Sequence, residues 1–107
     1  MRDEDVKFLV SSIVATTSNV TGVSVQALLS PIRLHRVVLA RWAVMQIASY
    51  RYGLTLNQIG RHLGRRHHTT VLHGLREAKK LPEEFTKLVM EIDEKLTSVR
   101  ETNRVTA

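Results

Sequence analysis

The sequence predicts an all-α domain organised around a helix-turn-helix, and three observations support this prediction. Apolar residues recur at the three- and four-residue spacing of a helix through most of the 107 residues. No segment shows the two-residue alternation of a strand. Only five glycines and two prolines occur, and most of them stand where a helix would start or stop. We therefore expect about six helices in a single domain that covers residues 1–107.

The first two helices are predicted from apolar spacing and from one capping serine. The first begins at Asp3, and the segment TSNVTGVS, residues 17–24, is expected to break it. Its inward positions are Val6, Leu9, Val10, Ile13 and Val14. Ser24 can then cap a short helix that runs through Leu29.

A loop and a long helix follow. The segment SPIRLHR, residues 30–36, predicts a loop opened by proline. The long helix is expected over about residues 37–52, where apolar residues again share one face. Its inward positions are Ala40, Ala43, Val44, Ile47 and Ala48.

The helix-turn-helix is expected over about residues 55–80. Gly53 ends the long helix, since glycine tolerates a left-handed cap. Thr55 and Gln58 form the T-x-x-Q pattern of a capping box, which predicts a short first helix to about Leu63.

The second helix of this motif is expected over about residues 67–80, after a tight turn at Gly64. Its inward positions are Val71, Leu75 and Ala78. Its outward positions are mostly basic or hydroxyl-bearing: Arg66, Thr69, His73, Arg76 and Lys80, with Thr70 and Glu77 at the edge. The helical wheel places His67 and His68 nearer the core, although the start of such a helix reaches deepest into a groove. This chemistry suits phosphate oxygens and base edges in a major groove.

Pro82 opens a last, amphipathic helix over about residues 82–100. Its apolar positions are Phe85, Leu88, Val89, Ile92, Leu96 and Val99. Its i,i+4 ion pairs are Glu83–Lys87 and Glu91–Lys95. We expect this helix to fold back onto the core, because a small chain needs the buried area. The alternative is that it packs against a second copy or against another protein.

The totals favour an anionic partner and exclude several classes of site. The 16 Lys and Arg residues outnumber the 10 Asp and Glu residues, which gives a formal net charge of +6. The chain has no cysteine, so a disulfide framework, a thiolate zinc site and a cysteine nucleophile are excluded. The acidic N-terminus and the absence of a long apolar run argue against secretion and membrane insertion, so we expect a cytoplasmic protein.

A metal site is not expected, although there are five histidines. Helical metal ligands need a spacing of three or four residues. His62 and His67 are five apart, as are His68 and His73, and only His73 and Glu77 have a usable spacing. No phosphate-binding loop and no G-x-S-x-G pattern occurs, so we expect no enzyme, no nucleotide and no cofactor. Mixed charges on the last helix argue against a membrane surface.

The stretch GRRHHTTVLHG, residues 64–74, preceded by LTLNQIGRHL, resembles the C-terminal DNA-binding domain of the bacterial replication initiator DnaA. The likeness extends upstream through GVSVQALLS and downstream into the last helix. It implies a six-helix fold of the Trp-repressor/DnaA C-terminal type that binds short, partly A·T-rich duplex sites called DnaA boxes. The recognition helix would enter the major groove, and an arginine of the preceding loop the adjacent minor groove.

The resemblance, together with the basic outer face of the helix, predicts the site residues. Base contacts are expected from Arg33, in the minor groove, and from His67, His68 and Thr69. Contacts to the DNA backbone are expected from Arg41, Leu56, Arg65, Arg66, Thr70, His73 and Arg76. We expect a protein associated with the nucleoid that competes with or modulates the initiator, or regulates transcription.

Some positions depart from the family. His67 stands where the family has Asp, whose carboxylate can accept a hydrogen bond from a cytosine amino group, so the preference at that base pair is expected to differ. Arg65 replaces a glycine. At five more positions the family usually has Arg, Arg, Pro, Gln and Pro. In the same order, this chain has His35, Leu39, Ala40, Trp42 and Asn57. DnaA carries an ATP-binding module that this sequence does not contain, so the chain is either an excised domain or a free-standing protein, and we expect the second. The alternative function is a protein-interaction module that keeps the fold without reading DNA.

Overall fold

The computed structural model describes residues 1–106, with side chains through residue 99, and these residues form helices without a strand. The elements are α1 (Asp3–Thr21), α2 (Val25–Leu29), α3 (His35–Gln46), its π-helical continuation η1 (Ile47–Arg51), α4 (Leu56–His62), α5 (His68–Ala78) and α6 (Glu83–Thr106). The predicted all-α class and the order of six α-helices are confirmed over this part of the chain. The last residue of the predicted domain, Ala107, lies outside the described residues.

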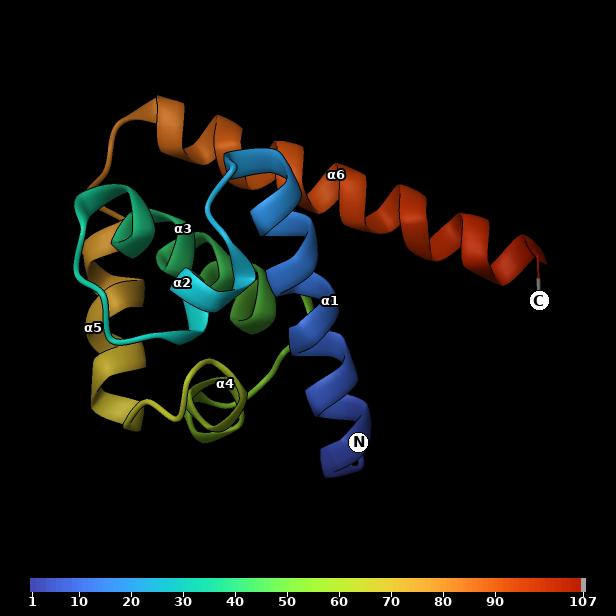
Figure 1. Ribbon diagram of the computed structural model, residues 1–107, viewed down its shortest axis with the longest axis horizontal. Coiled ribbons are helices and arrows are strands. Elements are labelled where there is room, and N and C mark those ends of the chain that lie inside the picture. Colours follow the sequence, from blue (N-terminus) through green and yellow to red (C-terminus); the bar gives the residue numbers. More distant parts are fainter. Residues whose placement is uncertain (107) are drawn as a thin grey trace.

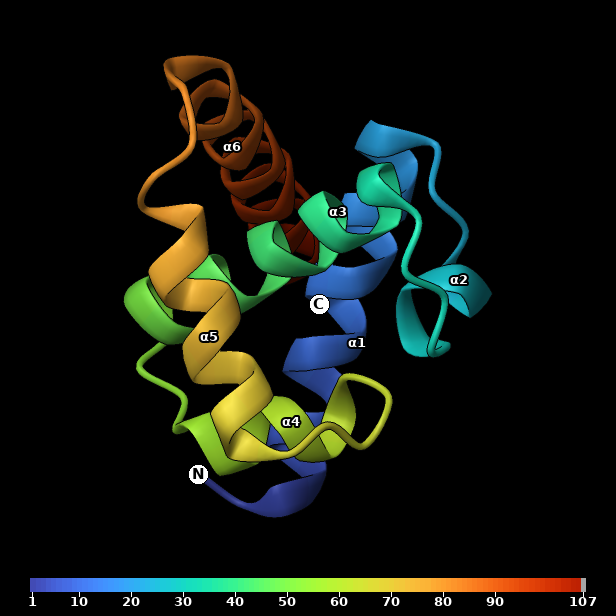
Figure 2. The same cartoon turned by 90° about the vertical axis from the view of Figure 1, so that its left-hand side faces the viewer.

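The helices pack around α3, which contacts α1, α2, α5 and α6. Figure 1 shows α6 lying across one end of the bundle and extending well past α1, while α4 and α5 lie at the other side. Figure 2 shows the helix-turn-helix, in which the start of α5 lies against α4. Within the described part of the chain, no helix is both long and apolar enough to cross a membrane.

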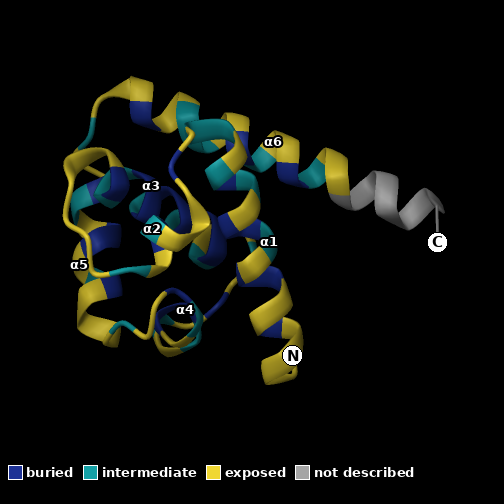
Figure 3. Ribbon diagram, in the orientation of Figure 1, coloured by how far each residue is buried: buried dark blue, intermediate teal, exposed yellow. Residues whose placement is uncertain are grey.

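The core forms from the apolar faces that the sequence predicts. Every inward position named above for the first helix, the long helix and the second helix of the motif is buried. Figure 3 shows these buried positions turned toward the centre, with exposed residues along the outer edge of α5. Such a continuous apolar core is the main stabilising contribution in a domain of this size.

The first helix continues into the segment that was expected to break it. It ends at Thr21, and Gly22 closes it with a left-handed backbone (φ 77°). Ser and Thr disfavour helices when their side chains bond the backbone elsewhere, but here the hydroxyl groups donate along the helix. Thr16 Oγ1 donates to the Ser12 carbonyl at 2.9 Å, and Thr21 Oγ1 to the Thr17 carbonyl at 2.7 Å. The predicted break at residues 17–24 was therefore wrong for its first five residues.

The long helix starts at His35, two residues earlier than predicted, and its last turn is the π-helical η1. Gly53 stops it, as expected, with a left-handed backbone (φ 66°), and its amide donates to the Ser49 carbonyl at 3.0 Å. The extra residue of a π turn shifts the direction in which the chain leaves the helix. The chain then reaches α4, whose capping box at Thr55 and Gln58 is present as predicted.

The last helix folds back onto the core, as expected, and packs against α1 and α3. Phe85, Ile92 and Leu96 are buried. Val99 was expected on the same side but is 47% exposed, because α6 has by then passed beyond the bundle. Lys95 donates to Asn19 Oδ1 of α1 at 2.5 Å, whereas its predicted partner was Glu91.

Candidate nucleic-acid interface

The turn between α4 and α5 is held by one backbone hydrogen bond and a close contact at Gly60. The Arg66 amide donates to the Gly60 carbonyl at 2.8 Å. A Cβ on Gly60 would lie only 2.1 Å from the Arg66 carbonyl oxygen, so only glycine allows this approach. The chain turns through two left-handed residues, Gly64 (φ 73°) and Arg65 (φ 54°). Arg65 adopts this conformation at the cost of some strain, because a side chain disfavours it.

The recognition helix α5 packs its inner face tightly on α3. Val71, Leu75 and Ala78 are buried as predicted. Gly74 is buried as well, and a Cβ there would meet Met45 Sδ at 2.6 Å and Trp42 Cδ1 at 2.8 Å. Because the two helices approach this closely, α5 has little freedom to shift on α3.

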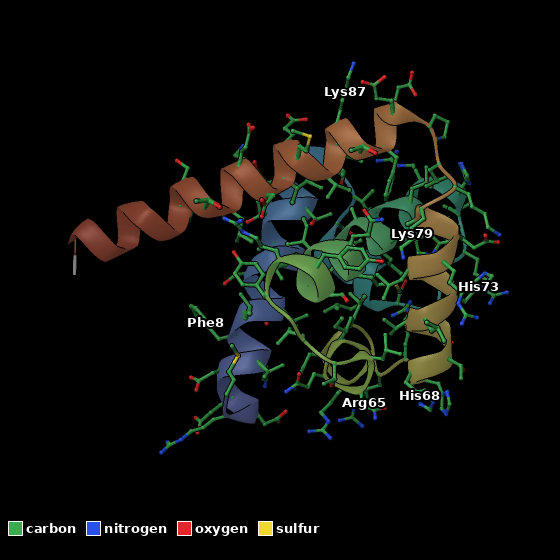
Figure 4. All side chains as sticks on the ribbon, turned by 180° about the vertical axis from the view of Figure 1, so that it is seen from behind. Phe8, Arg65, His68, His73, Lys79 and Lys87 are labelled. Carbon is green, nitrogen blue, oxygen red and sulfur yellow. The ribbon has the colours of Figure 1, made fainter. Side chains whose placement is uncertain are left out.

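The outer face of α5 is exposed and polar. The exposed residues are His68, Thr69, Thr70, His73 and Arg76, followed by Lys79 and Lys80. Figure 4 shows His68 and His73 on the outer side of this helix and Arg65 near its start, whereas Lys79 lies toward η1, with its Nζ 5.6 Å from the centroid of the Tyr50 ring. Lys80 Nζ lies 2.8 Å from Glu77 Oε2, and this hydrogen bond lowers the pKa of Glu77. The Lys80 charge is therefore offset locally by Glu77.

His67 is the N-cap of α5, and the helix begins one residue later than predicted. The Thr69 amide donates to His67 Nδ1 at 3.2 Å, and Thr69 Oγ1 lies 2.7 Å from the same nitrogen. The rings of His67 and His68 lie face to face, with centroids 4.2 Å apart and a tilt of 33°. Both are exposed, which corrects the position nearer the core given by the helical wheel. The wheel fails for His67 because this residue precedes the helix as its N-cap.

Arg33, the residue expected in the minor groove, is exposed in the loop before α3. Arg41 of α3, which was expected to contact the DNA backbone, is only 5% exposed. Arg41 Nε donates to the Leu28 carbonyl at 2.9 Å, and Nη2 donates to the carbonyls of Ala27 at 2.9 Å and Ser30 at 2.5 Å. Burial, followed by the charges of Arg66 and Arg33, lowers the pKa of Arg41 to about 10.

Arg41 therefore has a structural role inside the protein, which the sequence did not suggest. Its guanidinium closes the end of α2 and holds the loop that carries Arg33. Since the group is still protonated at neutral pH, its charge adds to the field at the surface. Its expected contact to a phosphate remains a prediction.

Arg66 has a similar position. Its Nη1 donates to the Leu63 carbonyl at 2.6 Å, and its Nη2 donates to the Ser30 carbonyl at 2.5 Å. The residue is half-buried, and this burial lowers its pKa. Of the predicted backbone contacts, Arg65, Thr70, His73 and Arg76 are therefore exposed, Leu56 and Arg66 are half-buried, and Arg41 is buried.

A cleft brings the loop and the recognition helix together. It lies between the loop before α3, the body of α3 and the turn of the motif. Its lining includes Arg33, Arg41, Arg65, Arg66, Thr70 and His73. Trp42 forms one wall, and its ring meets that of His73 edge-on, with centroids 6.5 Å apart at 78°. Four guanidinium groups in one open cleft make it a strongly positive surface.

Two features of the site had no clear signal in the sequence. Ser30 contributes a main-chain carbonyl, and main-chain groups leave no residue-type signature. Asp3 ties the start of α1 to α4, because its Oδ1 accepts from Arg61 Nη1 at 3.0 Å and lies 2.9 Å from His62 Nε2. No group of three or more acidic or imidazole side chains that could hold a metal ion occurs among the residues that the structure describes.

Comparisons with known proteins agree with this geometry. The sequence pattern of the family described as "Bacterial dnaA protein helix-turn-helix" matches residues 10–77, from α1 almost to the end of α5. The chromosomal replication initiator protein DnaA of Brucella abortus, and likewise that of Brucella suis, is 40% identical over 72 residues, which are 67% of this chain and 14% of the relative. The DnaA protein of Thermomicrobium roseum is 45% identical over 53 residues, 50% of this chain and 11% of the relative.

The matched segments make up only 14% and 11% of these longer relatives. The expected resemblance is confirmed. The protein belongs to the helix-turn-helix family of bacterial DnaA, which is a family of DNA-binding domains and not of enzymes.

Proposed function

We propose that the protein binds double-stranded DNA sequence-specifically, with α5 in the major groove and Arg33 in the adjacent minor groove. The observation that carries the proposal is the position of the exposed, polar face of α5 beside an arginine-lined cleft. A major groove about 12 Å wide accepts one α-helix with its side chains, and guanidinium groups flanking it can meet the phosphates.

The site divides into two parts by chemistry. His67, His68 and Thr69 lie at the start of α5, where a helix reaches deepest into the groove, and Arg33 lies on the loop; these four are the proposed base contacts. The proposed backbone contacts lie along the turn, the cleft and the length of α5: Arg41, Leu56, Arg65, Arg66, Thr70, His73 and Arg76. Phosphate contacts fix the register of the protein, and base contacts give its preference among sequences.

The DNA sites that we propose are similar to DnaA boxes, because the matched relatives are named chromosomal replication initiator proteins. The proposed roles are control of replication initiation, by competing with or modulating an initiator at its sites, or regulation of transcription. Both place the protein on the chromosome.

The test is a titration of labelled duplexes, with and without a DnaA box, at several salt concentrations. Sequence-specific binding predicts tighter binding to the box-containing duplex, and an affinity that falls as counterions are released at higher salt. Equal binding to both duplexes would defeat sequence specificity. No binding even at low salt would leave the alternative, a protein-interaction module.

Variants separate the two parts of the site. Thr69→Ala should narrow the difference between the two duplexes by roughly 1–3 kcal/mol, because it removes a base contact. Arg33→Ala should weaken binding to the specific duplex. The matched control is Lys87→Ala, which removes one positive charge from the outer side of α6, far from α5, and should leave the preference unchanged.

A further inference from the structure

We propose that His67 presents a hydrogen-bond donor to the DNA and thereby favours guanine, and rejects cytosine, on the strand that it faces. The inference rests on the proposed function, since it requires the start of α5 to lie in the major groove. It goes further by naming the base chemistry that one residue selects.

The Thr69 amide decides which ring nitrogen of His67 carries the hydrogen. The amide of Thr69 is a donor only, and it points at His67 Nδ1 over 3.2 Å. Nδ1 must therefore carry a lone pair and no hydrogen. A neutral imidazole with an unprotonated Nδ1 bears its hydrogen on Nε2. The capping bond thus leaves Nε2–H as the hydrogen-bonding group of the ring that is free to meet a ligand.

The hydroxyl group of Thr69 is also oriented by His67. Thr69 Oγ1 lies 2.7 Å from the same Nδ1, so the hydroxyl group donates to it. Its hydrogen is then occupied inside the protein, and its remaining lone pairs face outward as acceptors. His67 and Thr69 consequently present opposite polarities, a donor on the first and an acceptor on the second.

The imidazole ring of His67 is held in one orientation. Rotation of the His67 ring by half a turn would put the carbon Cδ2 in place of Nδ1 and break the cap. The ring of His68, stacked at 4.2 Å, covers one face of His67 and opposes such a rotation. His67 is exposed, so Nε2–H stands free to meet a ligand.

The Nε2–H donor of His67 suits some base edges and not others. In the major groove guanine offers two adjacent acceptors, N7 and O6, whereas adenine and thymine each offer one acceptor beside an amino or a methyl group, and cytosine offers only an amino donor. A donor at His67 therefore gains a hydrogen bond against guanine and meets a second donor against cytosine. An aspartate at this position would keep the N-cap but present an acceptor, and it should favour the opposite orientation of the base pair.

The experiment is a selection from a duplex library with a short randomised segment, carried out with the full chain and with His67→Asp. The two proteins should enrich sequences that agree at most positions and differ at one, with guanine for the wild type and cytosine for the variant. Two duplexes that differ only by reversal of that G·C pair should then differ in Kd by roughly fivefold or more for the wild type, and in the opposite direction for His67→Asp.

The outcomes distinguish the inference from the function beneath it. If the wild type enriches no sequence, the proposed function fails. If it enriches a sequence and His67→Asp enriches the identical one, the proposed function stands and the inference is overturned. Nitrogen-15 NMR of the wild-type imidazole gives a check that does not depend on the folding of a variant. A hydrogen on Nε2 of His67 is expected, and one on Nδ1 would overturn the proposal.

Discussion

Arg41 of α3 and Arg66 of the turn donate to the same acceptor, the carbonyl oxygen of Ser30, each over 2.5 Å. Two like charges converge on one main-chain oxygen because the loop brings it between α3 and the helix-turn-helix. This contact joins the loop and α3 to the turn of the helix-turn-helix, which lies 36 residues further along the chain. The loop that carries Arg33 is thereby fixed relative to the recognition helix.

Arg41→Ala should destabilise the domain by about 3 kcal/mol, because the buried carbonyl of Leu28 and the partly buried carbonyls of Ala27 and Ser30 lose a charged donor. Arg41→Lys should recover little of this loss, since one ammonium group cannot reach all three oxygens with the geometry of a guanidinium. Chemical denaturation of the two variants measures the effect. Equal stability of Arg41→Lys and the wild type would show that charge, and not the fork of hydrogen bonds, holds the loop.

Arg65 combines a left-handed backbone with a charge beside the proposed groove, and substitutions separate the two effects. Arg65→Gly should stabilise the fold by about 0.5 kcal/mol, because glycine relieves the strain at φ 54° while adding freedom to the unfolded chain. It should also reduce the slope of log affinity against log salt by about 1, through loss of one phosphate contact.

Arg65→Ala is the matched control for this position, because it loses the charge but keeps the strained backbone. It should reproduce the change in salt slope without the gain in stability. A normal salt slope in both variants would place Arg65 outside the DNA contact.

Gly74→Ala should destabilise the domain by about 2 kcal/mol, although alanine normally favours a helix. Its Cβ would collide with Met45 and Trp42 at the contact of α5 with α3. Gly53→Ala is the companion variant, since nothing lies within 4 Å of its Cβ and only the left-handed backbone opposes it. That variant should cost about 1 kcal/mol. Thermal unfolding compares them, and a harmless Gly74→Ala would mean that the two helices can separate freely.

The contact of Asp3 with α4 should make stability depend on pH. The hydrogen bond to His62, followed by that to Arg61, holds the pKa of Asp3 below its ordinary value of 3.8. A lowered pKa means that the unfolded chain takes up the proton first. The contact therefore stabilises the fold above the ordinary value, and this contribution is lost as the pH falls through the folded-state value.

Asp3→Asn should accordingly lower the unfolding midpoint at neutral pH, and its difference from the wild type should shrink as the pH falls below the ordinary value of 3.8. Denaturation curves at several pH values measure this. Asp5→Asn removes a carboxylate from the same turn of α1 and serves as the control. A difference that persists undiminished in acid would assign the effect to something other than the charge of Asp3.

The sequence predicted most of the fold because local signals agreed with one another. Ser24, Thr55 and Gln58 are caps whose partners lie within three residues, so their roles follow from spacing alone. The end of α1 was missed because threonine can either break a helix or donate to its own preceding turn. Only the packing of Thr17 in the core decides between these outcomes.

The candidate site was predictable where it depends on side-chain type and not where it depends on main-chain partners. The exposed face of α5 followed from helical spacing. The burial of Arg41 did not, since its partners are carbonyl oxygens 11 to 14 residues away along the chain. The same holds for His67, whose role as a cap depends on the backbone of the turn before it.

The contact between Gly74 and Trp42 bears on how the protein would meet DNA of different shapes. Helix α5 packs against α3, and the loop that carries Arg33 is anchored at the start of the same helix. The two proposed DNA contacts, one in each groove, are therefore held at a fixed distance from each other. A duplex whose grooves lie at another spacing must deform to fit, and the energy of that deformation varies with base sequence. Discrimination would then extend to base pairs that no side chain touches.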